Sequence, residues 1–125
     1  MHIKAMHSPD PYVYNVYLYL EKHFPGCVQL VNKTLYRKDG TKKLKLDVVT
    51  KRQIIEVKKK NVDIDQCKRQ MEYAKEHNLE YTCLVVETSG LECKRYKKFN
   101  VTNNLDDLIK KEKKKWRLMY IQKTN

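Results

Sequence analysis

A predicted β-hairpin organises the sequence: Leu44-Lys45-Leu46-Asp47-Val48-Val49-Thr50-Lys51-Arg52-Gln53-Ile54-Ile55-Glu56-Val57-Lys58. Two runs with many β-branched residues, 44–49 and 53–58, flank a short polar turn, which is typical of a hairpin. With Lys51 and Arg52 as the turn residues, three pairs face each other: Thr50 with Gln53, Val48 with Ile55, and Asp47 with Glu56. Since side chains alternate along a strand, we expect one face to hold Asp47, Glu56 and Lys58, and the other Leu44, Leu46, Val48, Ile55 and Val57.

Two carboxylates that face each other across a strand pair repel, unless a cation lies between them. Their hard oxygen atoms suit Mg²⁺ or Mn²⁺. Lys58 lies two residues beyond Glu56 and reaches the same site. The alternative is a cross-strand ion network on an exposed sheet face, but Val49 and Ile54 on that face argue against full exposure.

The pattern Asp47 followed by Glu56-Val57-Lys58 resembles the PD-(D/E)XK nuclease superfamily, with Leu46 where that family has a proline. The resemblance implies that Asp47, Glu56 and the Val57 carbonyl bind Mg²⁺ or Mn²⁺. It also implies that Lys58 orients the attacking water or stabilises the phosphate.

Further site residues are expected after the lysine strand. Gln70 and Tyr73 look like the glutamine and tyrosine that several branches of the superfamily carry on the next helix, with Gln66 as a neighbour. Gln70 could position the water or a phosphate, and Gln66, Tyr73, Lys59 and Lys60 are expected to bind nucleic acid. Ordinary helix surface is the alternative for the three helix residues. Whether Glu21 or Asn15 of the first helix joins the metal site stays open.

The remaining elements are predicted from apolar spacing, turn residues and helix caps. Asp10 and Pro11 start a helix over 12–24, and Asp63 or Asp65 starts another that runs to about residue 77. Strands are expected at 27–37 and 81–87, the latter buried and parallel to a neighbour. A basic edge strand at 94–101 and a last helix from 105 to about 120 complete the chain; that helix has Leu105, Leu108, Ile109, Glu112, Trp116 and Met119 inside, and Lys110, Lys111, Lys113, Lys114 and Lys115 outside.

We therefore expect an α/β fold: a flexible leader over 1–11 and one domain over 12–125. The order helix, three strands, helix, strand matches the restriction-endonuclease-like αβββαβ core, in which helices flank a mixed central sheet. The basic strand and the last helix are additions to this core.

Composition points to a polyanionic partner. The 125 residues include 27 Lys and Arg against 15 Asp and Glu, a net charge of +12, which favours nucleic acid, although a lysine-rich solvated surface is the alternative. No apolar run spans a membrane and no signal peptide is seen, so we expect an intracellular protein with no membrane partner. Four cysteines lack metal-finger spacing and are expected to be reduced.

These observations lead to three hypotheses about function. The first is a small Mg²⁺- or Mn²⁺-dependent DNA endonuclease. The second is an RNA-cleaving nuclease of the same fold, such as a toxin-type tRNase, because nothing in the sequence reports on the 2′-hydroxyl. The third is a basic nucleic-acid-binding module without catalysis. A homodimer or a protein partner is compatible with each.

Overall fold

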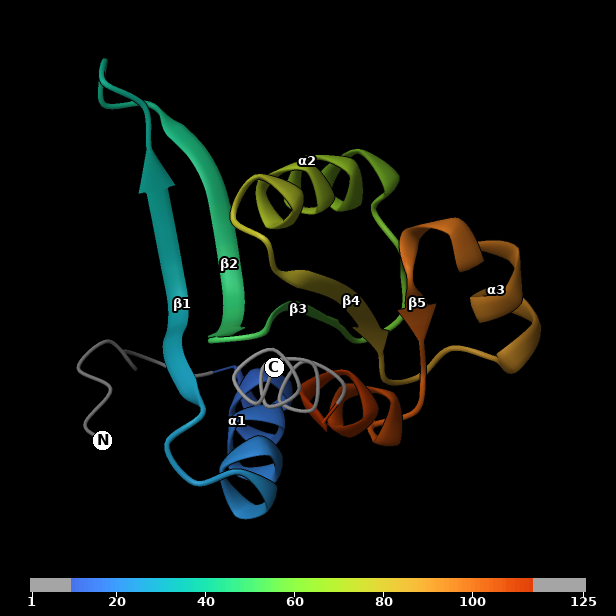
Figure 1. The fold of residues 1–125 in the computed structure, drawn as a ribbon. Helices are drawn as coiled ribbons and strands as arrows, with labels where there is room; N and C mark the ends of the chain where they lie inside the picture. The colour runs from blue at the N-terminus through green and yellow to red at the C-terminus, as the bar shows by residue number, and fades with distance from the viewer. Residues whose placement is uncertain (1–9, 114–125) are drawn as a thin grey trace, which may run out of the picture.

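Residues 10–113 are described by the computed structural model, and they form one five-stranded sheet with helices on both faces (Figure 1). A last helix begins at residue 106 and continues to 113, the end of the described range. In chain order the elements before it are α1 Pro11–His23, β1 Val28–Tyr36, β2 Lys42–Thr50, β3 Gln53–Lys58, α2 Ile64–Glu76, β4 Glu80–Val85, α3 Gly90–Arg95, the 3₁₀ helix η1 Lys97–Phe99 and β5 Val101–Thr102. The predicted order of one helix, three strands, a helix and a strand is confirmed.

The sheet is mixed and its strands follow the chain, in the order β1-β2-β3-β4-β5. The first three strands are antiparallel neighbours, while β4 runs parallel to β3 and β5 parallel to β4. The α2 crossover makes the parallel β3–β4 pair possible, because parallel neighbours need a long connection. The predicted parallel strand after the second helix is thus confirmed.

Both predicted helix starts are correct. The Asp10 carboxylate accepts a hydrogen bond from the Tyr12 amide and Pro11 is the first helical residue. At α2 the cap is Asp63, whose carboxylate accepts from the Gln66 amide. A side-chain oxygen in this position replaces one of the hydrogen-bond partners that the first turn of a helix lacks.

The hairpin register agrees with the prediction, because Val48 pairs with Ile55 and Val49 with Ile54. Its face assignment is wrong for two residues. Leu44 and Leu46 pack with Val49 and Ile54 on the α2 side of the sheet. Alternation breaks between Leu46 and Val48, opposite Asn32 of β1, which has a positive φ of 53° and lies between the Val31–Val48 and Lys33–Leu46 pairs. The β2 strand is also long and visibly curved (Figure 1).

Two apolar cores fill the space between the sheet and the helices. One lies under α2 and α3 and includes Cys67, Ala74, Cys93 and Phe99. The other lies under α1 and the last helix, where Val48, Ile55, Val57 and Leu84 from the sheet meet Val13, Val16, Leu20 and Leu108. All four cysteines are buried and free.

The region after β4 differs from its prediction. A basic edge strand was expected at 94–101, but α3 and η1 occupy most of this segment and only Val101–Thr102 pairs as β5. Ser89 caps α3 by accepting from the Glu92 amide. This Ser-x-x-Glu pattern is typical of a helix start. Lysines at 94, 97 and 98 therefore lie on helical turns.

The last helix is partly as predicted. Leu108 and Glu112 are buried, but Leu105 is exposed. Lys111 does not face outward as predicted, because its Nζ donates to the Tyr81 carbonyl at 2.8 Å and to the Thr82 Oγ1 at 2.5 Å. Lys114, Lys115, Trp116 and Met119 lie outside the described residues, as does most of the expected leader.

Replacing Ile55 by Ala should lower the free energy of unfolding by about 2–5 kcal/mol, because Ile55 is fully buried at the centre of the sheet and the change leaves a cavity. Urea denaturation followed by circular dichroism measures it. Leu91→Ala is the control, since Leu91 is 79% exposed and should cost less than ~0.5 kcal/mol. Equal losses in the two variants would contradict this packing.

Candidate metal and phosphodiester site

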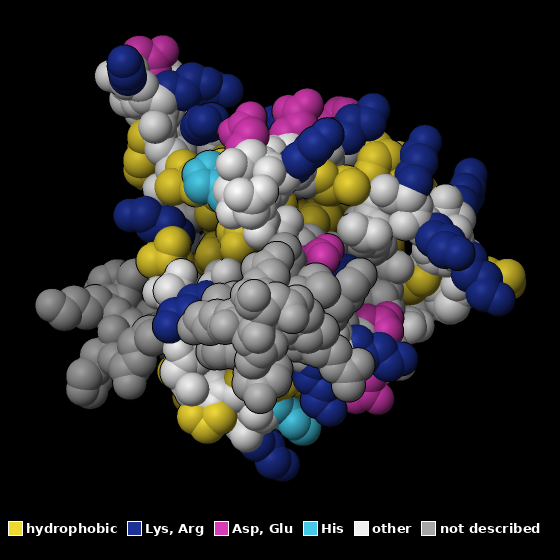
Figure 2. All heavy atoms as spheres, viewed as in Figure 1, with side chains coloured by type: hydrophobic (Ala, Val, Ile, Leu, Met, Phe, Trp, Pro, Cys, Tyr) yellow, Lys and Arg dark blue, Asp and Glu magenta, His cyan; other side chains and the backbone are white. Residues whose placement is uncertain are grey.

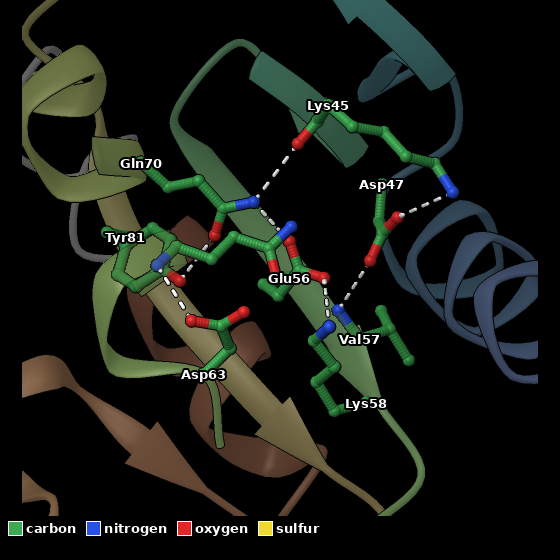
Figure 3. A network of polar contacts seen from close by, with 9 residues as sticks. Lys45, Asp47, Glu56, Val57, Lys58, Asp63, Gln70 and Tyr81 are labelled. Atoms are coloured by element: carbon green, nitrogen blue, oxygen red, sulfur yellow. Dashed lines mark hydrogen bonds and ion pairs between the residues drawn. The ribbon is translucent and has the colours of Figure 1, made fainter. Parts of the chain in front are cut away.

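The two predicted acids lie side by side inside the protein. Asp47 is on β2 and Glu56 on β3, and they are only 5% and 3% exposed. They lie where the hairpin opens: β3 pairs with β4 along its whole length but with β2 at Val48 and Val49. The curved β2 thus leaves room for two carboxylates between neighbouring strands (Figure 3).

In this opening the Asp47 carboxylate, rather than a carbonyl of β2, accepts the hydrogen bond from a β3 amide. Its Oδ2 accepts a hydrogen bond from the Val57 amide at 2.9 Å. Its Oδ1 lies 4.0 Å from the Lys45 Nζ, a distance at which charges attract without a hydrogen bond. Lys45 precedes Asp47 by two residues on the same strand, so both side chains point to one side.

Glu56 has one oxygen toward α2 and one toward Lys58. The Gln70 Nε2 donates to Oε2, while Oε1 lies 3.9 Å from the Lys58 Nζ. Burial and the neighbouring Asp47 carboxylate raise the pKa of Glu56 to about 8. Both causes disfavour a second negative charge in a buried site, so in the absence of a metal ion Glu56 holds a proton near neutral pH.

A chain of hydrogen bonds fixes the Gln70 side chain. Its Nε2 also donates to the Lys45 carbonyl at 3.1 Å, and its Oε1 accepts from the Tyr81 hydroxyl at 2.6 Å. Burial is the largest cause that raises the pKa of Tyr81, so this hydroxyl stays protonated and donates. The amide can therefore present only its NH₂ group to Glu56 (Figure 3). Gln70 is fully buried, so we assign it to positioning Glu56 rather than to contact with a phosphate.

The Val57 backbone fits the role that the resemblance implies. The N–H and C=O of one strand residue point to the same neighbour. The Lys58 carbonyl accepts from the Val86 amide, toward β4, whereas the Val57 amide points to Asp47 on β2. The Val57 carbonyl is therefore directed to the same side as Asp47.

The other predicted residues lie around this centre. Gln66 and Tyr73 are partly buried on α2, and Tyr73 stacks on His77 at 4.0 Å between ring centroids. Lys59 and Lys60 follow β3 in an exposed turn. Their carbonyls accept from the Glu87 amide and the Thr88 hydroxyl, which ties this turn to the chain after β4.

The two candidates on the first helix have other neighbours. Glu21 accepts a hydrogen bond from the Gly26 amide and so closes the turn after α1. Asn15 lines a hollow with Leu84 and Val86. Within residues 10–113, the site is thus built from β2, β3, α2 and β4.

Sequence reasoning missed two members of the network. Lys45 could have been found, because it has the strand parity of Asp47. Tyr81 could not, since it was simply the first residue of an apolar run and its hydroxyl finds Gln70 only through the crossover of α2.

Two carboxylates and a carbonyl are the oxygen donors that this site offers to a cation. Hard donors of this kind suit Mg²⁺ or Mn²⁺, which keep several waters as further ligands. A bound cation would also relieve the repulsion that raises the pKa of Glu56. Across the described part of the chain, no three His, Cys, Asp or Glu side chains gather as a metal-binding group.

Comparison of the chain with protein-family models, with curated proteins and with solved structures finds no match. Among the helices of residues 10–113, none combines the length and apolar character needed to span a membrane. The assignment of a function thus depends on the geometry of the site.

The free energy of unfolding in EDTA should fall as pH rises from about 4.5 to about 8. The folded chain has the higher Glu56 pKa, about 8 against 4.5. The stability from this proton is therefore fully present below pH 4.5 and lost as pH rises through 8. Urea denaturation at half-unit pH steps measures it. Glu56→Gln should flatten this part of the profile; parallel profiles for the two proteins would contradict the raised pKa.

Proposed function

We propose that this chain is a metal-dependent phosphodiesterase that cuts nucleic acid, with Mg²⁺ or Mn²⁺ as its cofactor. The observation that carries the proposal is the buried Asp47–Glu56 pair, with Lys58 3.9 Å from Glu56. Buried titratable groups with shifted pKa values and a charged neighbour are typical of functional sites. The αβββαβ order of the elements around the pair supports a restriction-endonuclease-like core of the PD-(D/E)XK type.

Asp47, Glu56 and the Val57 carbonyl would hold the cation. When bound, Mg²⁺ or Mn²⁺ lowers the pKa of a bound water and stabilises the charge that develops on a phosphate. The chain itself keeps the ligands in place: the Val57 amide holds Asp47, and Gln70 holds Glu56.

Lys58 is the residue suited to meet the substrate. Its side chain is 32% exposed, whereas that of Glu56 is 4% exposed, so the ammonium group can reach both the acids and the solvent. There it can orient a water or donate to a phosphate oxygen. With Glu56 ionised, its carboxylate would keep the Lys58 ammonium group in place.

DNA is the substrate that we propose first, and RNA stays the alternative, because no described side chain is identified as a partner for the 2′-hydroxyl. The second candidate function is a nucleic-acid-binding module without catalysis. One observation favours it: the Val57 amide and Gln70 already satisfy one oxygen of each acid. The net charge of +12 fits both functions.

A cleavage assay tests the nuclease proposal. Wild-type protein should nick supercoiled plasmid, or cleave tRNA, in Mg²⁺ or Mn²⁺ and not in EDTA. Asp47→Asn and Lys58→Ala should each lower the rate at least ~100-fold, since the first removes a charged ligand of the cation and the second removes the ammonium group that meets the phosphate. Asp65→Asn is the control, because Asp65 is an exposed acid on α2. This variant should cleave at the wild-type rate.

Two outcomes separate the candidates. Cleavage that Asp47→Asn retains in full would reject the site. Binding of nucleic acid without any metal-dependent cleavage by wild type would favour the binding module. Plasmid and tRNA tested side by side distinguish a DNA enzyme from an RNA enzyme.

Metal binding can be measured without activity. MgCl₂ should raise the unfolding temperature at pH 8, because ligand at 100 times its dissociation constant stabilises the fold by about 2.7 kcal/mol. Asp47→Asn keeps an acceptor for the Val57 amide but removes the charge. MgCl₂ should therefore not raise the unfolding temperature of this variant. NaCl at the same ionic strength is the control for screening. An equal rise in both proteins would place Mg²⁺ elsewhere.

A further inference from the structure

A basic cleft lies beside the two acids, between the β1–β2 hairpin and α2. Its volume is about 380 Å³. Among residues 10–113, no acid lines it, although it is flanked by an acidic helix surface. Its polar lining consists of five cations and one amide: Arg37, Lys42, Lys43, Lys45, Arg69 and Gln66.

The cleft adjoins the candidate site through Lys45. Lys45 belongs to both, because it lines the cleft and its Nζ lies 4.0 Å from the Asp47 Oδ1. Its carbonyl is bound by Gln70, which also holds Glu56. A polyanion held in the cleft therefore lies next to the residues that hold the two acids.

The cations are spaced and held along the hairpin. Lys43 and Lys45 are exposed and two residues apart, or roughly 7 Å along a strand, and the buried Leu44 between them also lines the cleft. Arg37 is fixed across the hairpin end, where its Nη1 donates to the Lys42 carbonyl at 2.7 Å. Figure 2 shows Lys and Arg side chains gathered on this hairpin.

Acids on α2 restrict where a polyanion can bind beside the cleft. A neighbouring hollow of about 200 Å³ shares Arg37, Lys43 and Arg69 but is also lined by Glu72 and Glu76. Negative charge there repels a phosphate backbone. The favourable path for a polyanion thus runs from Arg37 and Lys42 toward Lys45, and away from the C-terminal half of α2.

We propose that this cleft binds the sugar-phosphate backbone of one nucleic-acid strand and leads it to Asp47 and Glu56. The inference rests on the proposed function, and it adds the surface that positions the substrate. Phosphate contacts position nucleic acid without reading its sequence, so this surface accepts DNA or RNA of any sequence.

Binding in EDTA tests the cleft without any need for cleavage. The probe is a fluorescein-labelled single-stranded DNA of 20 nucleotides, followed by anisotropy over a range of NaCl concentrations. Lys43→Gln with Arg69→Gln should weaken binding about tenfold at 0.1 M NaCl. The slope of log Kd against log[NaCl] should fall by about 1.4, or 0.7 for each lost phosphate contact.

The control double variant is Lys94→Gln with Lys97→Gln, which removes the same charge from exposed positions on α3 and η1. Its affinity should stay within about twofold of wild type. Equal weakening in the two double variants, or none in either, would overturn the cleft. So would equally tight binding of polyglutamate, because the partner would then be any polyanion.

The two proposals fail in different ways. If the cleft variant loses DNA binding while wild type cleaves nothing in Mg²⁺, the cleft stands and the nuclease fails. If wild type cleaves and Asp47→Asn does not, but the cleft variant binds normally, the nuclease stands and the cleft fails. Unchanged unfolding temperatures of both double variants show that folding is intact.

Discussion

The placement of two carboxylates side by side between β2 and β3 is the constraint on which the site depends. Like charges in a buried site repel, and a continuous backbone ladder would leave no room for them. The structure meets the constraint because β2 pairs with β3 only at Val48 and Val49 and leaves it before Val48, while β4 pairs with β3 along its full length. Asp47 then accepts the Val57 amide that the ladder no longer serves. The opening in the hairpin and the site are therefore one feature.

The hydrogen bonds around the acids run in one donor-to-acceptor order, from Tyr81 to Gln70 and from Gln70 to Glu56. A buried phenol that keeps its proton can donate to Gln70, and this fixes which end of the amide faces Glu56. An amide facing the other way would set two acceptors against each other in a buried place, which is costly. Positions on β4 and α2 thus determine the orientation of a carboxylate on β3, and the α2 crossover is as necessary to the site as the hairpin.

Short-range rules of sequence predicted the hairpin and the helix starts. Turn residues and alternation were enough to pair Val48 with Ile55 and to bring Asp47 near Glu56, and the caps at Asp10 and Asp63 set two helix starts correctly. Failures came where the backbone departs from a regular strand and where a local helix cap was overlooked. The break in alternation opposite Asn32 put Leu44 and Leu46 in the other core, and Ser89 caps α3 where a basic strand was predicted. Tyr81 and Lys111 acquired their partners only through the packing of distant elements.

The energetics of the acid pair favour a role outside folding. Two buried carboxylates destabilise a fold when both are charged, and without a cation Glu56 avoids this by holding a proton near neutral pH. Apolar residues of similar volume commonly stabilise a fold more than buried ionisable groups do. The two nearby lysines compensate only partly, because each lies about 4 Å from its acid and is itself exposed to water. A divalent cation supplies what the lysines do not, since it can contact both carboxylates at once. Negative charge at the acids also explains why a cationic cleft beside them matters. A phosphate that approaches ionised Asp47 and Glu56 is repelled by them, and Lys45 and its neighbours offset that repulsion.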